Sequence, residues 1–164
     1  MTPNHHHEVS VSALLVGAFE RDRQLIQEIF RKTGWCLYEA HDRHRALNFL
    51  DRYPIQVVIA ETDLDGWSWK KVLLDLQNRE QPPQLIVTSR HADDRLWAEA
   101  LNMGAFDVLA QPFERKEVER AVESAHRHVL VQPGRATHAD TTLKRQTQKD
   151  ELGLLQASRQ VSAA

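Results

Sequence analysis

The feature that most constrains the fold of this chain is a strict alternation between short apolar runs and segments of helical periodicity. Five apolar runs have the length and composition of strands, and the β-branched run VVIA is typical of a strand buried on both faces. After each run, apolar residues recur at helical spacing. The predicted strands are 12–18, 35–40, 57–60, 85–88 and 106–110, and the predicted helices are one around Leu25–Phe30 that stops at Gly34, followed by 45–53, 69–77, 94–103 and 114–130.

This alternation predicts a parallel sheet with helices on both faces. Because crossover connections between parallel strands are right-handed, few topologies remain. We therefore predict a flavodoxin-like α/β fold, a doubly wound five-stranded parallel sheet in the order 2-1-3-4-5. Asp42 is a predicted helix N-cap, and Gly34 and Gly104 are predicted helix ends. In such a fold, functional residues gather at the carboxyl ends of the strands.

Composition and charge limit the possible domain organisation and the possible classes of function. We predict a flexible tail over residues 1–10, a folded domain over 11–131 and a mostly disordered tail over 132–164, with one weak helix around Leu143–Leu155. The second tail is too short and too poor in apolar residues to form a DNA-binding output unit. A net charge of -2, one cysteine and no long apolar run predict a cytoplasmic chain that binds neither nucleic acid nor membrane.

Several polar residues follow the predicted strands, so that they are expected to meet at one edge of the sheet. They are Glu20 after the first strand, Glu61, Thr62 and Asp63 after the third, Thr88 and Ser89 at the fourth, and Gln111 after the fifth. Together they predict a modest polar crevice around Glu61. No glycine-rich loop follows the first strand, and a nucleotide cradle is therefore not predicted.

From about Ser12 to Leu130 the chain resembles the receiver domain of bacterial two-component response regulators, the CheY-like family. The resemblance rests on LLV before the first loop, GW after the first helix, VVIAE followed by DG, LIVTS, and NMGAFDVLAQPF. It implies an acid pair after strand 1 and an aspartate at the end of strand 3 that hold Mg²⁺, and this aspartate accepts a phosphoryl group. A hydroxyl on strand 4 and a lysine before a proline then bind the phosphoryl oxygens, and an aromatic residue on strand 5 turns inward.

This sequence departs from the family pattern at the positions that carry the chemistry. The resemblance places the acid pair at Gly17 and Ala18, the phospho-acceptor at Glu61, the lysine at Gln111 and the switch aromatic at Val108. The strand-4 hydroxyl is kept as Thr88. The remaining pocket is predicted to comprise Glu20, Asp63, Thr88, Gln111 and Pro112, with Pro112 after a cis peptide bond.

These departures predict a loss of the family reaction. Mg²⁺ requires oxygen ligands near octahedral positions, and phosphoryl transfer depends on positioning and charge neutralisation. We therefore expect no Mg²⁺ binding, no other cofactor, no enzymatic activity and no phosphorylation at useful rates. The predicted function is a degenerate receiver domain in bacterial two-component signalling that acts by protein–protein interaction. Its partner would bind the face made by the fourth helix, the fifth strand and the fifth helix, and a homodimer is an alternative.

Other interpretations of the same residues stay open at this point. The chain could be a phosphorylatable receiver with an unusual site, or a small flavodoxin-like cofactor-binding protein. Glu61 is either a polar relic or a fixed mimic of an aspartyl phosphate, although it carries less charge than a phosphoryl group. Thr88 either bonds to the local backbone or takes part in switching.

The remaining aromatic, histidine and cysteine residues have simpler predicted roles. Two of Trp67, Trp69 and Trp97 are expected in the core, and an exposed one near the fourth helix would anchor a partner. Cys36 is predicted to be an inert buried thiol. Four histidines lack the carboxylate and cysteine neighbours that a metal site needs, and they are predicted to be solvated, namely His41, His44, His126 and His128.

Overall fold

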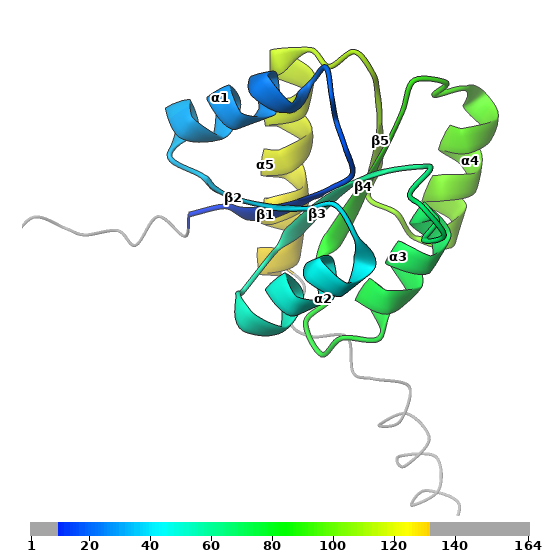
Figure 1. Cartoon of the computed structure of the whole chain (residues 1–164), viewed down its shortest axis with the longest axis horizontal. Helices are drawn as coiled ribbons and strands as arrows, with labels where there is room; N and C mark the ends of the chain where they lie inside the picture. The colour runs from blue at the N-terminus through cyan, green and yellow to red at the C-terminus, as the bar shows by residue number, and fades with distance from the viewer. Residues whose placement is uncertain (1–9, 132–164) are drawn as a thin grey trace, which may run out of the picture. The chain divides into compact units, whose positions relative to one another are not determined.

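A computed structural model describes residues 10–131, which form a five-stranded parallel sheet in the order β2-β1-β3-β4-β5 (Figure 1). The predicted fold class and strand order are confirmed. In chain order the elements are β1 (Ser12–Val16), α1 (Arg23–Thr33), β2 (Cys36–Ala40), α2 (Arg43–Arg52), β3 (Val57–Glu61), α3 (Trp69–Gln77), β4 (Gln84–Ser89), α4 (Asp94–Met103), β5 (Asp107–Ala110) and α5 (Arg115–Val131).

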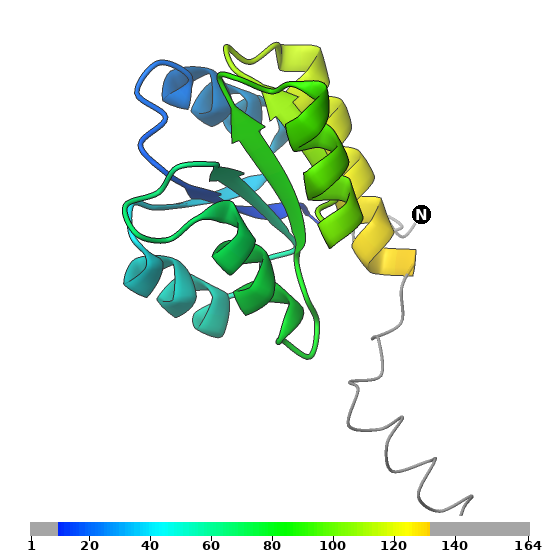
Figure 2. The ribbon, with the colours of Figure 1, turned by 90° about the vertical axis from the view of Figure 1, so that its right-hand side faces the viewer.

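The helices lie in two layers, one on each face of the sheet. Helices α1 and α5 pack on one face around Ile26, Phe30 and Val122, and α2, α3 and α4 pack on the other around Leu50 and Leu76. In the second layer α2 and α3 lie side by side, as the two views agree (Figure 2). Both layers bury alternate residues of the same strands, which explains why the strands read as continuous apolar runs.

Local capping signals fix the helix ends where the sequence places them. The Asp42 carboxylate accepts the Arg45 N–H at 2.8 Å at the start of α2. Gly34 and Gly104 adopt left-handed backbone angles after α1 and α4, with φ of 74° and 108°. These conformations carry little cost for glycine, because a glycine has no Cβ.

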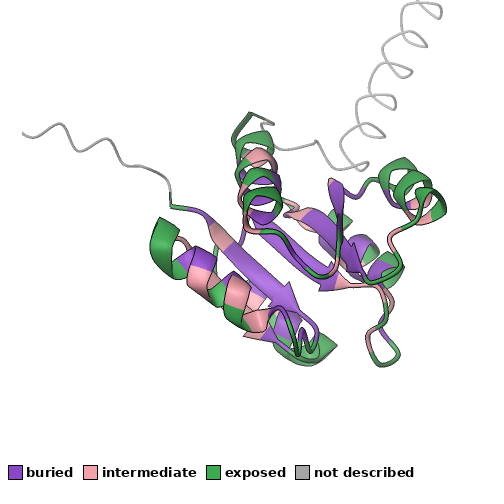
Figure 3. Ribbon diagram, turned by 90° about the horizontal axis from the view of Figure 1, so that it is seen from above, coloured by how far each residue is buried: buried purple, intermediate pink, exposed green. Residues whose placement is uncertain are grey.

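Burial follows the sheet (Figure 3): β1, β3, β4 and β5 are mostly buried, the edge strand β2 is mostly half-buried, and the outer helix faces are exposed. Trp67 and Trp69 are buried, whereas Trp97 on α4 is 36% exposed, which confirms the predicted division of the tryptophans.

The prediction for Cys36 is wrong, since its side chain is exposed. Cys36 begins β2, an edge strand that pairs only with β1, so its start is covered on fewer sides than an inner strand. A hydrogen bond with the Cys36 side chain raises the pKa of the Tyr38 hydroxyl to about 12.

The prediction for His126 is also wrong, because its side chain is only 8% exposed. His126 follows Val122 by one helical turn and therefore shares the buried face of α5. Its Nδ1 lies 2.9 Å from Gln56 Oε1. The other three histidines of the predicted group, His41, His44 and His128, are exposed as expected.

The predicted tails lie outside the described residues apart from Ser10, and so does the predicted helix at Leu143–Leu155. These predictions remain untested. Between residues 10 and 131, none of the helices combines the length and the apolar character that crossing a bilayer would require.

Candidate functional site

The candidate site lies where β1, β3 and β4 end at the carboxyl edge of the sheet. Parallel pairing aligns Val16 of β1 with Ala60 of β3, and Glu61 of β3 with Thr88 of β4. Gly17 follows β1 directly, so its backbone lies beside the Glu61 side chain. The sheet register alone thus brings together residues that are far apart in the sequence.

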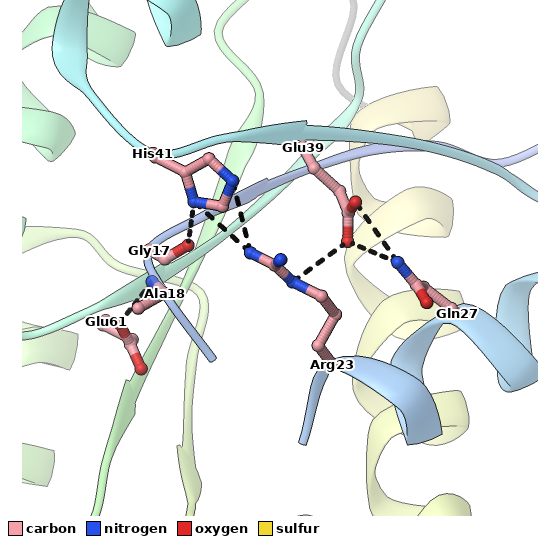
Figure 4. A network of polar contacts seen from close by, with 7 residues as sticks. All are labelled: Gly17, Ala18, Arg23, Gln27, Glu39, His41 and Glu61. Atoms are coloured by element: carbon pink, nitrogen blue, oxygen red, sulfur yellow. Dashed lines mark hydrogen bonds and ion pairs between the residues drawn. The ribbon is translucent and has the colours of Figure 1, made fainter. Parts of the chain in front are cut away.

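Glu61 is half-buried, and its side chain lies beside the loop that follows β1 (Figure 4). Its Oε2 accepts the Ala18 N–H at 3.0 Å. Gly17 has a φ of 142°, and a Cβ built on it would lie 2.4 Å from Glu61 Oε2 and 2.9 Å from a ring carbon of Phe19. Glu61 therefore occupies the space that any side chain at position 17 would need. The structure brings Gly17, Ala18 and Glu61 together.

The other residues at the edge bond mostly to the backbone of the neighbouring strand. The Thr88 hydroxyl donates to the Ala60 carbonyl at 3.3 Å and is fully buried, which favours the local-backbone interpretation of this residue. Gln111 donates its backbone N–H to the Ser89 carbonyl at 2.9 Å, and its bond to Pro112 is cis as expected. Val108 is buried in the core beneath α4 and has no ring to rotate.

Two predicted pocket residues do not join Glu61. Glu20 and Asp63 are both exposed, and neither forms a hydrogen bond or an ion pair with the site residues among residues 10–131. Glu20 lies in the loop after β1 and Asp63 in the loop after β3. The described part of the carboxyl edge thus holds one central carboxylate, Glu61, instead of the three that the family pattern implies.

Sequence reasoning missed a polar network that continues from Glu61 to the edge strand (Figure 4). His41 Nδ1 lies 3.2 Å from the Gly17 carbonyl, and Arg23 Nη2 lies 3.3 Å from the His41 ring. Arg23 Nε is 3.7 Å from Glu39 Oε1, and Gln27 donates to the same oxygen at 3.1 Å. These residues come from α1, β2 and the turn before α2, so no local sequence pattern marks them as neighbours.

A second missed contact ties the loop after β1 to the loop after β5. The buried Asp22 carboxylate accepts the Phe113 N–H at 3.2 Å, although the two residues are 91 positions apart. The rings of Phe19 and Phe113 also lie 6.0 Å apart. An aspartate just before an apolar helical stripe could have signalled a cap, but its long-range partner is visible only in the fold.

The residues present do not fit the Mg²⁺ site that the family pattern implies. No group of three or more histidine, cysteine or acidic side chains gathers within residues 10–131 in the way a metal site requires. The acid-pair positions, Gly17 and Ala18, have no carboxylates, and one oxygen of Glu61 is already bonded to a backbone N–H. A hard cation such as Mg²⁺ would find too few oxygen ligands here.

The order of the strands and the site at their carboxyl edge define a doubly wound α/β domain of the flavodoxin-like class. Residues 14–123 match the family model described as the response regulator receiver domain. This match covers more than half of the chain, and the chain therefore belongs to the response regulator receiver domain family.

Individual relatives agree with this family. Protein PetR of Rhodobacter capsulatus is 28% identical over 116 residues, which are 71% of this chain and 48% of that protein. Sporulation initiation phosphotransferase F of Bacillus subtilis is 22% identical over 101 residues, which are 62% of this chain and 82% of that protein. The chain also covers 24% of the regulatory protein AtoC of Escherichia coli. The chain thus spans about half or less of the length of several longer relatives.

Solved structures show the same fold. The signal receiver domain of an HD domain-containing protein from Pseudomonas fluorescens Pf-5 aligns with a TM-score of 0.67 at 23% identity, covering 75% of this chain and 99% of that one. Full-length FixJ from B. japonicum aligns with a TM-score of 0.65 at 21% identity, covering 73% and 59%.

Proposed function

We propose that this receiver domain takes part in two-component signalling by binding proteins, without being phosphorylated at position 61. The observation that carries the proposal is the hydrogen bond from the Ala18 N–H to Glu61 Oε2. The same oxygen occupies the place that a Cβ at position 17 would take. The side chain at the acceptor position is thus turned into the space of the acid pair. A glutamate held in this way serves as a fixed charge.

Charge neutralisation supports the same conclusion. Phosphoryl transfer is catalysed mainly by positioning the groups and by neutralising the developing charge. Here the lysine position is Gln111, which carries no charge, and the Thr88 hydroxyl already donates to Ala60. A glutamate is also one methylene longer than an aspartate, and a misplacement of about 1 Å can cost about a hundredfold in rate.

Phosphorylation can be tested directly with acetyl phosphate or beryllofluoride in the presence of Mg²⁺. We expect no saturable amide shifts around Glu61 and Thr88 in heteronuclear NMR spectra, and no phosphoryl adduct by mass spectrometry. A receiver domain that retains the family aspartate and acid pair is the positive control. Saturable shifts at these residues that disappear in Glu61→Gln would overturn the proposal and favour a working phosphoreceiver.

The partner surface that we propose is the α4–β5–α5 face. Trp97 and Leu101 are 36% and 46% exposed and lie one turn apart on α4. Both are about 200° around the helix from Glu99, which pairs with Lys70 of α3. The two apolar side chains therefore point away from α3, toward the β5 side. Exposed tryptophans are enriched among the residues that dominate binding energy.

A matched pair of substitutions tests this surface. Trp97→Ala should weaken binding of a captured signalling partner, or of a second copy of the chain, by at least about tenfold. Tyr53→Ala removes an aromatic side chain that is similarly exposed, at the end of α2, and should leave binding unchanged. Calorimetry measures the partner affinity and sedimentation measures the homodimer. Equal binding by both variants would exclude the α4–β5–α5 face.

A further inference from the structure

The edge strand β2 presents backbone groups that no other strand occupies within residues 10–131. Cys36 donates its N–H to the residue before β1, and the Ala40 carbonyl accepts from the loop that follows β1, so positions 36, 38 and 40 bond toward β1. Alternate residues of a strand bond to opposite sides. The N–H and carbonyl groups of Leu37 and Glu39 therefore point outward, away from the sheet.

This edge lacks the usual protection against pairing with another chain. Proteins guard edge strands with lysines, prolines, bulges, inward-pointing charges or very short strands. The sequence of β2, CLYEA, has neither lysine nor proline. Its one charged side chain, Glu39, is drawn toward α1 by Arg23 and Gln27 (Figure 4). The opposite edge strand, β5, has only four residues and begins with the buried Asp107. Strand addition is thus favoured at β2.

A second copy of the same strand fits this edge best in one antiparallel register. When Tyr38 lies opposite Tyr38 of the second copy, Leu37 lies opposite Glu39, and each such pair exchanges both backbone hydrogen bonds. A register centred on Leu37 would place Glu39 opposite Trp35, whose N–H already bonds within its own copy. A register centred on Glu39 would oppose two like charges. The pairing centred on Tyr38 satisfies the outward groups and has the two-fold symmetry of a closed dimer.

Helix α1 supplies a charge that matches this register. Arg23 and Gln27 are one turn apart and both contact Glu39, so their stripe of α1 faces the β2 edge. Arg31 continues the stripe one turn further, about 5.4 Å toward the start of β2. Two strand residues, from Glu39 back to Leu37, span about 6.8 Å. Arg31 is therefore about level with Leu37. It is exposed, and it forms no ion pair with the residues that the structure describes.

The register centred on Tyr38 brings an acid group to this arginine. Leu37 packs in the layer of α1, and Glu39 of the second copy lies opposite it on the same face of the sheet. This carboxylate comes within reach of Arg31, and the two-fold axis repeats the contact. We propose that two copies of this chain associate by antiparallel pairing of their β2 strands, with Arg31 of each copy bound to Glu39 of the other.

This inference goes beyond the proposed function and does not depend on it. The β2 edge and the α4–β5–α5 face lie at opposite ends of the strand order. A dimer formed through β2 therefore leaves the α4–β5–α5 face of each copy to a different protein.

Sedimentation of the full chain over a range of concentrations tests the proposal. We expect a reversible dimer that Arg31→Glu weakens by about tenfold, because both symmetric contacts become repulsive. This loss should shrink at high salt. Arg95→Glu makes the same charge change on an exposed residue of α4 and should leave the dimer unchanged.

A backbone substitution tests the strand pairing itself. Leu37→Pro removes an outward N–H from each copy, a position where an edge strand tolerates proline, and should weaken the dimer by at least about tenfold. Circular dichroism checks that this variant is folded. Arg31→Glu changes only an exposed side chain, so it decides the question if Leu37→Pro does not fold.

A chain that stays monomeric at millimolar concentration would overturn the inference, and so would a dimer that Arg31→Glu and Arg95→Glu weaken equally. Loss of the dimer in Trp97→Ala would also overturn it, because the second copy would then bind the α4–β5–α5 face. That result would leave the proposed function standing. Phosphoryl labelling of Glu61 would overturn the proposed function alone, since pairing through β2 does not involve the acceptor position.

Discussion

Two glycines with positive φ perform different tasks in this domain. Gly104 ends α4 with a φ of 108°, and a Cβ there would lie 3.0 Å from the end of the flexible Gln77 side chain. Gly17 follows β1 with a φ of 142°, and a Cβ there would lie 2.4 Å from the Glu61 carboxylate. The first glycine serves only to end a helix. The second glycine leaves room for the Glu61 carboxylate. The position of the Glu61 side chain therefore depends on the absence of a side chain at position 17.

The largest effect is expected on the free energy of unfolding when each of these two glycines is replaced. Gly17→Ala should lower the free energy of unfolding by about 3 kcal/mol, because it combines a strained φ with overpacking against Glu61 and Phe19. Gly104→Ala should cost about 1 kcal/mol, since the Gln77 side chain can move away. Urea unfolding measures both values. A larger loss in Gly104→Ala would contradict the distinction between the two glycines.

Restoring the family residues tests whether the site can be recovered. The variant Gly17→Asp, Ala18→Asp, Glu61→Asp and Gln111→Lys should gain at least about a hundredfold in Mg²⁺-dependent labelling by acetyl phosphate. It should also be less stable by about 1–3 kcal/mol, since an aspartate at position 17 meets an unfavourable φ. The triple variant that keeps Gly17 is the control. A folded quadruple variant without labelling would show that the loop backbone has diverged.

A smaller effect is expected from the contact that holds the same loop from its other end. Asp22→Ala should cost about 2 kcal/mol, because it leaves the buried Phe113 N–H without its acceptor. Asp22→Asn keeps an acceptor oxygen and should recover most of this loss. The exposed Glu20→Ala should change stability by less than about 0.5 kcal/mol. Thermal unfolding compares the three variants, and equal losses at positions 20 and 22 would refute the role of Asp22.

The smallest effect is the energetic coupling between Gly17 and Glu61. In a double-mutant cycle, Gly17→Ala should cost about 1 kcal/mol less when Glu61→Ala is already present, because the overlap with the carboxylate is gone. The strained φ and the Phe19 contact remain in both backgrounds, which limits the coupling. Strictly additive losses in urea unfolding would show that the two positions are independent.

Most of the fold could be predicted from the sequence because its signals are local. The bounds of α3 and α4 agree with the prediction at both ends, since apolar periodicity and capping residues lie within each segment. The residues at the acceptor and acid-pair positions lie together at the carboxyl edge, because the parallel register aligns the strand ends. Their detailed arrangement could not be predicted, because the turn of Glu61 toward Gly17 depends on a backbone angle and on the sheet register.

The errors have the same physical origin. The residue type of Cys36 favours the core, but burial at the start of an edge strand depends on what covers that edge. The polarity of His126 favours the surface, although its spacing from Val122 places it on the buried face of α5. The contacts of Arg23, His41 and Glu39 join three elements and require the folded chain.

The Ala18 N–H donor has a consequence for how this site can vary during evolution. The donor belongs to the main chain, and the Ala18 side chain itself is exposed. Any residue except proline supplies the same N–H, so position 18 can drift in sequence while its hydrogen bond persists. Comparisons based on side-chain identity would score such drift as decay of the site. The interaction would nevertheless be inherited intact through the backbone.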